Sequence, residues 1–219
     1  MENKRTIMAL PKWIWMTASI LVTFSLAILS GCVGTSVQPR FYILSTLSTF
    51  STNQGSAEAT QAVSRGDLVI GIGPVILPAY LKRHQIVTRI DSNRLMLNEF
   101  HRWAEPLEEG IPRLLREYMS SCEPVSQIVS YPWSKSIKLD YQVRIEILRM
   151  DGVLGGNVVL DARWTILDHT KKVLFSQKAL FSDQTEDSGF SAYVVAQSRL
   201  VAELSDKICS SLKGAEKIN

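Results

Sequence analysis

Residues 85–107 read QIVTRIDSNRLMLNEFHRWAEPL, and this stretch predicts a β-hairpin that runs directly into a helix. Residues 85–90 alternate in polarity, as a half-buried strand does. Residues 91–93 (Asp-Ser-Asn) form a turn, because their short polar side chains can bond the local backbone. Residues 94–100 are then the partner strand. Pro106 suits the first turn of a helix, where its missing N–H costs nothing.

The joint between the hairpin and the helix also contains acidic, basic and imidazole side chains, which are the residue types that active sites use. We favour a structural interpretation, in which Trp103 packs beneath the helix and Pro106 begins it. Glu105 then lies near the helix N-terminus, where it can pair with Arg102. The alternative is a hydrolase that uses the cluster of Glu99, His101 and Arg102 for acid–base chemistry.

Two stretches have the periodicity of amphipathic helices. The first places apolar side chains on one face from Leu107 to Cys122, although Gly110 and Pro112 favour a kink or a later start near Ile111. The second stretch is 190–212. Its apolar face comprises Val194, Val201, Leu204, Ile208 and Leu212.

Further strands are predicted on both sides of the first helix. They cover 40–44, 67–72, 137–148, 157–167 and 172–176, and the last three form an antiparallel meander. The order of strands, helix, strands, helix predicts an α+β fold. We expect a single antiparallel or mixed sheet with the two main helices packed on one face.

The N-terminus has the pattern of a bacterial export signal. Basic residues precede an uncharged apolar run over 13–29, which ends in Leu-Ser-Gly-Cys at 29–32. This tetrapeptide resembles a lipobox, so we expect Cys32 to be acylated and to become the first residue of the mature chain. The alternative is a plain transmembrane anchor, although about 17 apolar residues are at the short end for a bilayer. An Asp directly after the lipidated cysteine usually retains a lipoprotein at the inner membrane, so Val33 at this position favours the outer membrane.

These features divide the chain into a signal peptide (1–31), a tether from the lipidated cysteine (32–40), a single α+β domain (41–213) and a tail (214–219). Residues 45–65 have few large apolar side chains, so a mobile loop is expected there. The signal carries three basic residues and one acidic residue, so its removal lowers the net charge from +3 to +1. A nearly neutral domain is not an electrostatic nucleic-acid binder.

The sequence contains few residues in the spacings that catalytic or metal-binding sites require. The histidines at 84, 101 and 169 lack zinc-ligand spacing. A glycine pair at 71 and 73 lacks the third glycine of a dinucleotide loop. Cys122 and Cys209 can form a disulfide in an oxidising compartment, or remain two buried thiols. We expect no metal and no cofactor apart from the covalent lipid on Cys32.

Several short motifs, taken in order, resemble the ABC-type transport auxiliary lipoprotein family, the PqiC/YmbA-like proteins. They are the lipobox, Phe41-Tyr42 with Leu44, GIGPV at 71–75, LPAYL at 77–81, QIVTR at 85–89, Asn93 with Leu95, RWAEPL at 102–107, and Tyr131-Pro132-Trp133. One departure is Lys82-Arg83-His84, where family members often have Asp-Arg-Pro. The series covers nearly the whole mature chain.

The resemblance implies a non-enzymatic outer-membrane lipoprotein that faces the periplasm. Its implied partners are an MCE-domain protein and the inner-membrane components of an envelope lipid transporter, with a ring-shaped homo-oligomer as one arrangement. The alternative is a lipid-anchored structural or assembly factor outside any lipid pathway.

We also expect an interface for the partner within residues 77–84. An aromatic and aliphatic anchor with a cationic rim suits a protein interface, and the residues that supply it are Leu77, Tyr80, Leu81, Lys82 and Arg83. The alternative is a crossover loop that buries Tyr80 and Leu81 in the core.

Overall fold

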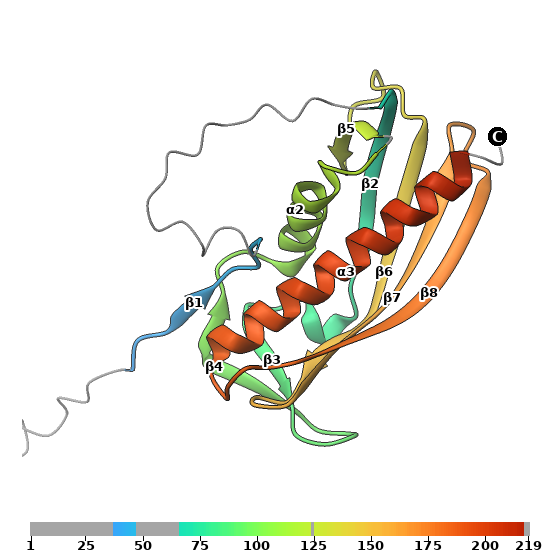
Figure 1. Ribbon diagram of the computed structural model, residues 1–219. Coiled ribbons are helices and arrows are strands. Elements are labelled where there is room, and N and C mark those ends of the chain that lie inside the picture. Colours follow the sequence, from blue (N-terminus) through green and yellow to red (C-terminus); the bar gives the residue numbers. More distant parts are fainter. Residues whose placement is uncertain (1–36, 47–65, 124, 217–219) are drawn as a thin grey trace, which may run out of the picture. The chain divides into compact units, whose positions relative to one another are not determined.

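The computed structural model describes residues 37–46, 66–123 and 125–216 (Figure 1). From Pro39 onward the chain forms one compact unit. The signal peptide predicted over 1–31, Cys32 with most of its tether, and residues 47–65 of the expected mobile loop lie outside the described residues.

A five-stranded mixed sheet forms the main layer. Its order is β5 (Val125–Ser130), β2 (Leu68–Ile76), β6 (Tyr141–Gly152), β7 (Asn157–Asp168) and β8 (Val173–Gln184). The predicted meander is confirmed, because β6, β7 and β8 pair antiparallel in sequence order. Strand β2 runs parallel to both β5 and β6. Sequence reasoning missed β5, and it ended β8 eight residues too early.

A separate three-stranded sheet contains the hairpin, so the prediction of a single sheet is wrong. Its order is β1 (Arg40–Tyr42), β4 (Leu95–Trp103) and β3 (Gln85–Arg89). The hairpin pairs as predicted, but β4 takes its second partner from β1, which runs parallel beside 101–103. A 3-10 turn, η2 (Ala79–Leu81), follows β2 and redirects the chain before β3.

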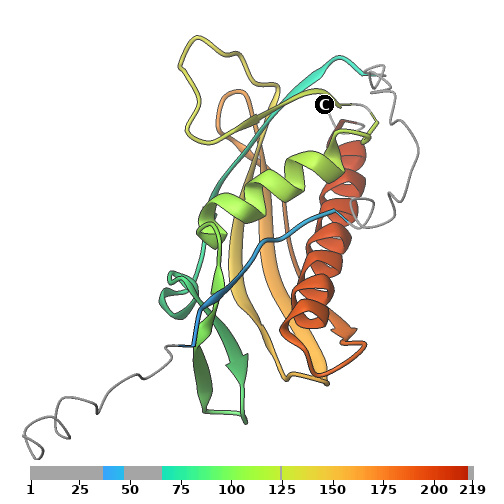
Figure 2. The same ribbon diagram turned by 90° about the vertical axis from the view of Figure 1, so that its left-hand side faces the viewer.

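Both helices cover the same face of the five-stranded sheet, as Figures 1 and 2 show. Helix α2 (Leu107–Met119) packs on β2 and β5, and α3 (Phe190–Glu216) packs on β7, β8 and α2. Helix α2 begins at Leu107 and includes Pro112 in its interior. Helix α3 extends past the predicted end at Leu212, because Ala215 is still buried against the core.

A disulfide links the two helical segments. Cys122, just after α2, is bonded to Cys209 in α3, with 6.0 Å between the Cα atoms. The bond closes a loop of 87 residues and lies on the helical layer. In the part of the chain that the structure describes, no helix is both long and apolar enough to cross a membrane.

Candidate functional site

Residues from two of the quoted motifs meet around a buried carboxylate, Asp151, near the end of β6. Its side chain is fully buried. Arg89 donates from Nε to Oδ1 at 2.6 Å and from Nη2 to Oδ2 at 2.9 Å. Arg149 and the Tyr80 hydroxyl donate to the same carboxylate at 2.9 Å each. Tyr80 of LPAYL and Arg89 of QIVTR are therefore structural partners of one buried anion.

The pKa values in this cluster agree with an ion pair held in place by hydrogen bonds. Burial alone would raise the pKa of Asp151, but the donors from Arg89, Arg149 and Tyr80 hold it below its ordinary value. Burial, together with the negative charge of Asp151, raises the pKa of Tyr80 to about 12. Tyr80 is consequently a neutral hydrogen-bond donor at physiological pH and not a proton-transfer group.

The predicted interface residues lie mostly in the core. Leu77 and Leu81 are 4% and 3% exposed, so neither aliphatic side chain is available to a partner. Arg83 is half-buried, and Lys82 remains exposed and pairs with Glu108 at 2.9 Å. The alternative of a crossover that buries its apolar side chains describes this segment, because Leu81 of η2 and Leu77 before it are both buried in the core.

The joint at 99–107 is an extension of β4 followed directly by α2. Trp103 is 3% exposed, and the carbonyl of Pro106 accepts the first N–H groups of the helix. The predicted pairing of Arg102 with Glu105 is wrong. Arg102 bonds Glu99 at 3.2 Å, and Glu105 bonds Arg113 at 2.6 Å.

That difference has a geometric cause. A register shift in the β3–β4 pairing places Gln85 opposite Arg102 but Ile86 opposite Asn98. The extra residues of β4 bulge outward between these positions, which lets Arg102 reach back to Glu99. Glu105 lies beyond the strand, where Arg113 of α2 is within reach.

His101 belongs to an aromatic cluster and does not face Glu99 as an acid–base partner. Its ring stacks on Phe190 with 3.7 Å between centroids, and its Nδ1 is hydrogen-bonded to the Tyr42 hydroxyl at 2.8 Å. Burial lowers the pKa of His101, and the charge of Arg40 lowers it further. The imidazole is therefore neutral at pH 7, and it ties β4 to β1 and to the start of α3.

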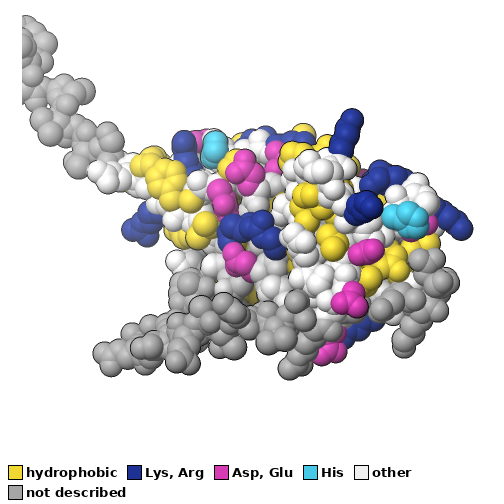
Figure 3. Space-filling view, turned by 90° about the horizontal axis from the view of Figure 1, so that it is seen from above, with side chains coloured by type: hydrophobic (Ala, Val, Ile, Leu, Met, Phe, Trp, Pro, Cys, Tyr) yellow, Lys and Arg dark blue, Asp and Glu magenta, His cyan; other side chains and the backbone are white. Residues whose placement is uncertain are grey.

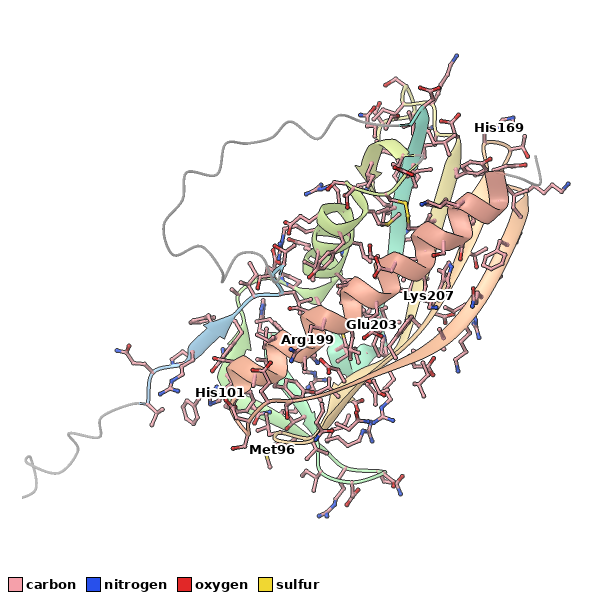
Figure 4. The ribbon with its side chains drawn as sticks, viewed as in Figure 1. Met96, His101, His169, Arg199, Glu203 and Lys207 are labelled. Atoms are coloured by element: carbon pink, nitrogen blue, oxygen red, sulfur yellow. A yellow bond between two sulfur atoms is a disulfide. The ribbon has the colours of Figure 1, made fainter. Side chains whose placement is uncertain are left out.

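Two other motifs come together at the opposite end of the domain. Figure 4 places His169 at that end and His101 and Met96 at the other. Gly71 and Gly73 leave room there for the segment that follows β5. A Cβ on Gly71 would lie 2.5 Å from Leu139 and 3.0 Å from Trp133, and one on Gly73 would lie 2.6 Å from Tyr131. GIGPV and Tyr-Pro-Trp are thus packing partners.

A pocket of about 590 Å³ opens where these motifs meet the β7–β8 turn. Its walls combine apolar side chains with cationic ones, and it is lined by Trp133, Lys135, Ile137, Lys138, Leu139, Asp140, Gln142, Asp168, His169 and Lys171. Figure 3, seen from above, shows Lys and Arg side chains interspersed with apolar surface on its right-hand side. Sequence reasoning found the tryptophan motif but not the pocket, because the lysines come from two distant loops.

The β7–β8 turn holds one of these lysines in place. Lys171 has φ 72°, a left-handed conformation uncommon for a residue with a side chain. Its Nζ donates to Gln142 at 2.9 Å and lies 5.9 Å from the Trp133 ring centroid, within cation–π range. Gln142 is itself buried and donates to the carbonyl of Gly73 at 2.8 Å.

The pocket's two carboxylates are occupied by the protein's own donors. Asp168 accepts the backbone N–H groups of Thr170 and Lys172, and the Thr170 hydroxyl first, then these N–H groups, lower its pKa. Asp140 accepts the N–H of Val69 at 2.7 Å. Across residues 37–46, 66–123 and 125–216, no group of His, Cys, Asp and Glu side chains is arranged to hold a metal ion.

Comparison with known proteins places the chain in a family. A family model described as the ABC-type transport auxiliary lipoprotein component matches residues 49–209, which is most of the chain. The chain belongs to this family. The resemblance carried by the motifs is therefore confirmed.

Two distant relatives of this ABC-type transport auxiliary lipoprotein have the same name. It is 22% identical over 167 residues to the intermembrane transport lipoprotein PqiC of Escherichia coli (strain K12), with 76% of this chain and 83% of that protein covered. PqiC of Shigella flexneri matches equally.

Two solved structures share the fold of this auxiliary lipoprotein, each with a TM-score of 0.60. A protein of Xanthomonas campestris is 12% identical and aligns over 83% of this chain and 95% of its own. An uncharacterized protein is 13% identical, with 80% and 99% covered. At these identities the likeness concerns the fold alone.

Proposed function

We propose that this protein is a non-enzymatic accessory subunit of an MCE/ABC-type envelope lipid transport system, anchored at the outer membrane through a lipid on Cys32. The family match over 49–209 carries the proposal, because that family is described as an auxiliary component of ABC-type transport. The similarity to PqiC, an intermembrane transport lipoprotein, supports transport between membranes as the process.

The contacts of the charged side chains support a role without catalysis. Glu99 is exposed and paired with Arg102, and His101 is stacked and hydrogen-bonded within an aromatic cluster. A general base needs a reacting group within hydrogen-bond reach, and its efficiency depends on a pKa near the working pH. Glu99 is instead bonded to Arg102 and to Gln85 of β3, and His101 is bonded to Tyr42 of β1, so both side chains connect β4 to its neighbours.

Chain length supports an orientation for the anchored domain. Eight peptide steps separate Cys32 from Arg40 and span at most about 28 Å when fully extended. Strand β1 lies beside His101 and Phe190, and Phe190 follows the Gln184 end of β8. The pocket lies at the Val173 end, about 40 Å away along a strand of 12 residues. A lipid on Cys32 would keep the β1 end close to the membrane and turn the pocket toward the periplasm.

Exposed apolar side chains at the β1 end are consistent with this orientation. Phe41 is 62% exposed, and Phe100 and Met96 on β4 are about half exposed. Apolar surface of this kind marks a site of contact with another molecule when it is contiguous. It lies at the end that the tether would bring to the lipid surface.

Gene deletion followed by complementation tests the proposal. We expect deletion to slow the movement of labelled phospholipid between the two membranes. Complementation with the wild-type chain should restore the rate of movement, and the chain should be recovered in the outer-membrane fraction. The Cys32→Ala variant should be released from the membrane and fail to restore movement, whereas the neighbouring Thr35→Ala variant should behave as wild type. An unchanged rate of movement after deletion would instead favour a structural factor and overturn the proposal.

A further inference from the structure

The pocket beside the β7–β8 turn has an excess of positive charge that the protein does not neutralise. Lys135, Lys138 and Lys171 line it. Among the described residues, no acidic side chain forms an ion pair with any of the three. Asp140 and Asp168 also line the pocket and accept backbone N–H groups, which leaves their formal negative charges in place. Three lysines against two carboxylates give the lining a formal net charge of +1.

The same pocket has an apolar wall. Trp133, Ile137 and Leu139 are half-buried, and they present carbon surface to the cavity between the lysines. A volume of about 590 Å³ lies within the roughly 300–1,000 Å³ typical of small-molecule sites. A small inorganic anion would use the cationic rim and leave the apolar wall in contact with water.

The wall is also fixed before any ligand arrives. Trp133 and Leu139 rest on Gly71, where a Cβ would displace them. Lys171 is held by Gln142, which is bonded in turn to Gly73. A site built in advance loses less conformational entropy when it binds.

From these observations we propose that the pocket binds a phosphorylated amphiphile. The lysines would take its phosphate, and Trp133 with its apolar neighbours would take the first part of its hydrocarbon. The interpretation of this ligand as a transported lipid rests on the proposed function. The binding itself requires only the protein and the ligand.

The test uses the intrinsic fluorescence of the mature lipidated chain, which begins at Cys32 and therefore lacks Trp13 and Trp15, in a neutral maltoside detergent. Trp103 and Trp164 are buried, so ligand-dependent changes in emission report mainly on half-buried Trp133. The probes are dihexanoyl phosphatidic acid, dihexanoyl phosphatidylcholine and inorganic phosphate. We expect a saturable change with the phosphatidic acid, and half-saturation at a concentration at least tenfold lower than for either of the other two.

Lysine variants connect that signal to the pocket. Combined Lys135→Gln, Lys138→Gln and Lys171→Gln substitutions should raise the half-saturating concentration at least tenfold with an unchanged thermal unfolding midpoint. Lys172→Gln is the matched control, because Lys172 lies on the same turn but does not line the pocket. It should leave binding unchanged.

Three outcomes would overturn the inference. If inorganic phosphate bound as tightly as the phosphatidic acid, the apolar wall would not contribute to binding. If the zwitterionic lipid bound as tightly, the lysines would not select the anionic headgroup. If no ligand gave a saturable change, the pocket would not be a binding site. None of these results bears on capture of transport partners in the envelope. Failure of this inference is therefore distinguishable from failure of the proposed function.

Discussion

Removal of the carboxylate at Asp151 should destabilise the domain far more than removal of an exposed carboxylate. The Asp151→Ala variant leaves Arg89, whose side chain is 20% exposed, with a largely buried and unpaired charge. It also removes the acceptor of the half-buried Tyr80 hydroxyl. Glu146→Ala is the matched control, since Glu146 pairs with Arg163 across two strands while both side chains remain over 40% exposed.

The magnitudes follow from the burial of the two pairs. Deletion of one partner of a buried ion pair costs about 3–5 kcal/mol, because the other charge stays buried without compensation. Loss of an exposed pair costs about 0–1 kcal/mol. With a urea m-value of about 2 kcal/mol/M, the unfolding midpoint should fall by about 2 M for Asp151→Ala and by less than 0.5 M for Glu146→Ala.

Urea unfolding of the detergent-solubilised chain, followed by far-ultraviolet circular dichroism, measures both variants. The m-values should stay equal to that of the wild type, so that each shift in midpoint reports stability alone. If Asp151→Ala shifts the midpoint no further than Glu146→Ala does, the buried cluster does not stabilise the fold, and the structural role given to Tyr80 and Arg89 is wrong.

Three further predictions concern other parts of the fold. Because the pKa of Asp151 is lowered in the folded state, its contribution to the free energy of unfolding is complete above the unfolded pKa of about 3.9 and is lost as pH falls through the folded pKa. The stability difference between wild type and Asp151→Asn, measured by urea unfolding at several pH values, should therefore shrink below about pH 4, and a constant difference would contradict this. Joint replacement of Cys122 and Cys209 by Ser should lower the free energy of unfolding by about 4–5 kcal/mol, from the entropy of closing a loop of 87 residues; mass spectrometry of the alkylated, non-reduced wild type must first show no free thiol at either position. Trp103→Ala should cost about 3–5 kcal/mol in the same unfolding assay, because the ring is buried; full stability with loss of transport would make Trp103 a contact residue instead.

The local elements of the fold follow from local patterns in the sequence. The hairpin of β3 and β4, the meander of β6 to β8 and both helices have periodicities that 10 to 20 residues suffice to reveal. The division into two sheets does not. It depends on β1 pairing with 101–103, about 60 residues away, and on the turn at Ala79–Leu81 that separates β2 from β3.

The polar contacts were less predictable than the elements. Arg102 and Glu105 are close in sequence, but the bulge in β4 directs Arg102 to Glu99. Asp151 gives no sign in sequence that it will meet Arg89, because 62 residues separate them.

Motifs were easier to find than the neighbours they would have in space. GIGPV and Tyr131-Pro132-Trp133 are both visible in the sequence, yet only the structure shows that Gly71 supports Trp133 and that Lys171 from a third segment lies beside the ring. A pocket assembled from three separate segments has no period and no fixed spacing by which sequence could reveal it.

Crosslinking in intact envelopes, followed by affinity capture of the full-length chain and identification of the bound proteins, tests membership of a transport system most directly. We predict recovery of an MCE-domain protein together with an ABC-type permease component, and loss of both when Cys32→Ala releases the chain from the membrane. Recovery of neither component with the wild-type chain would contradict the account.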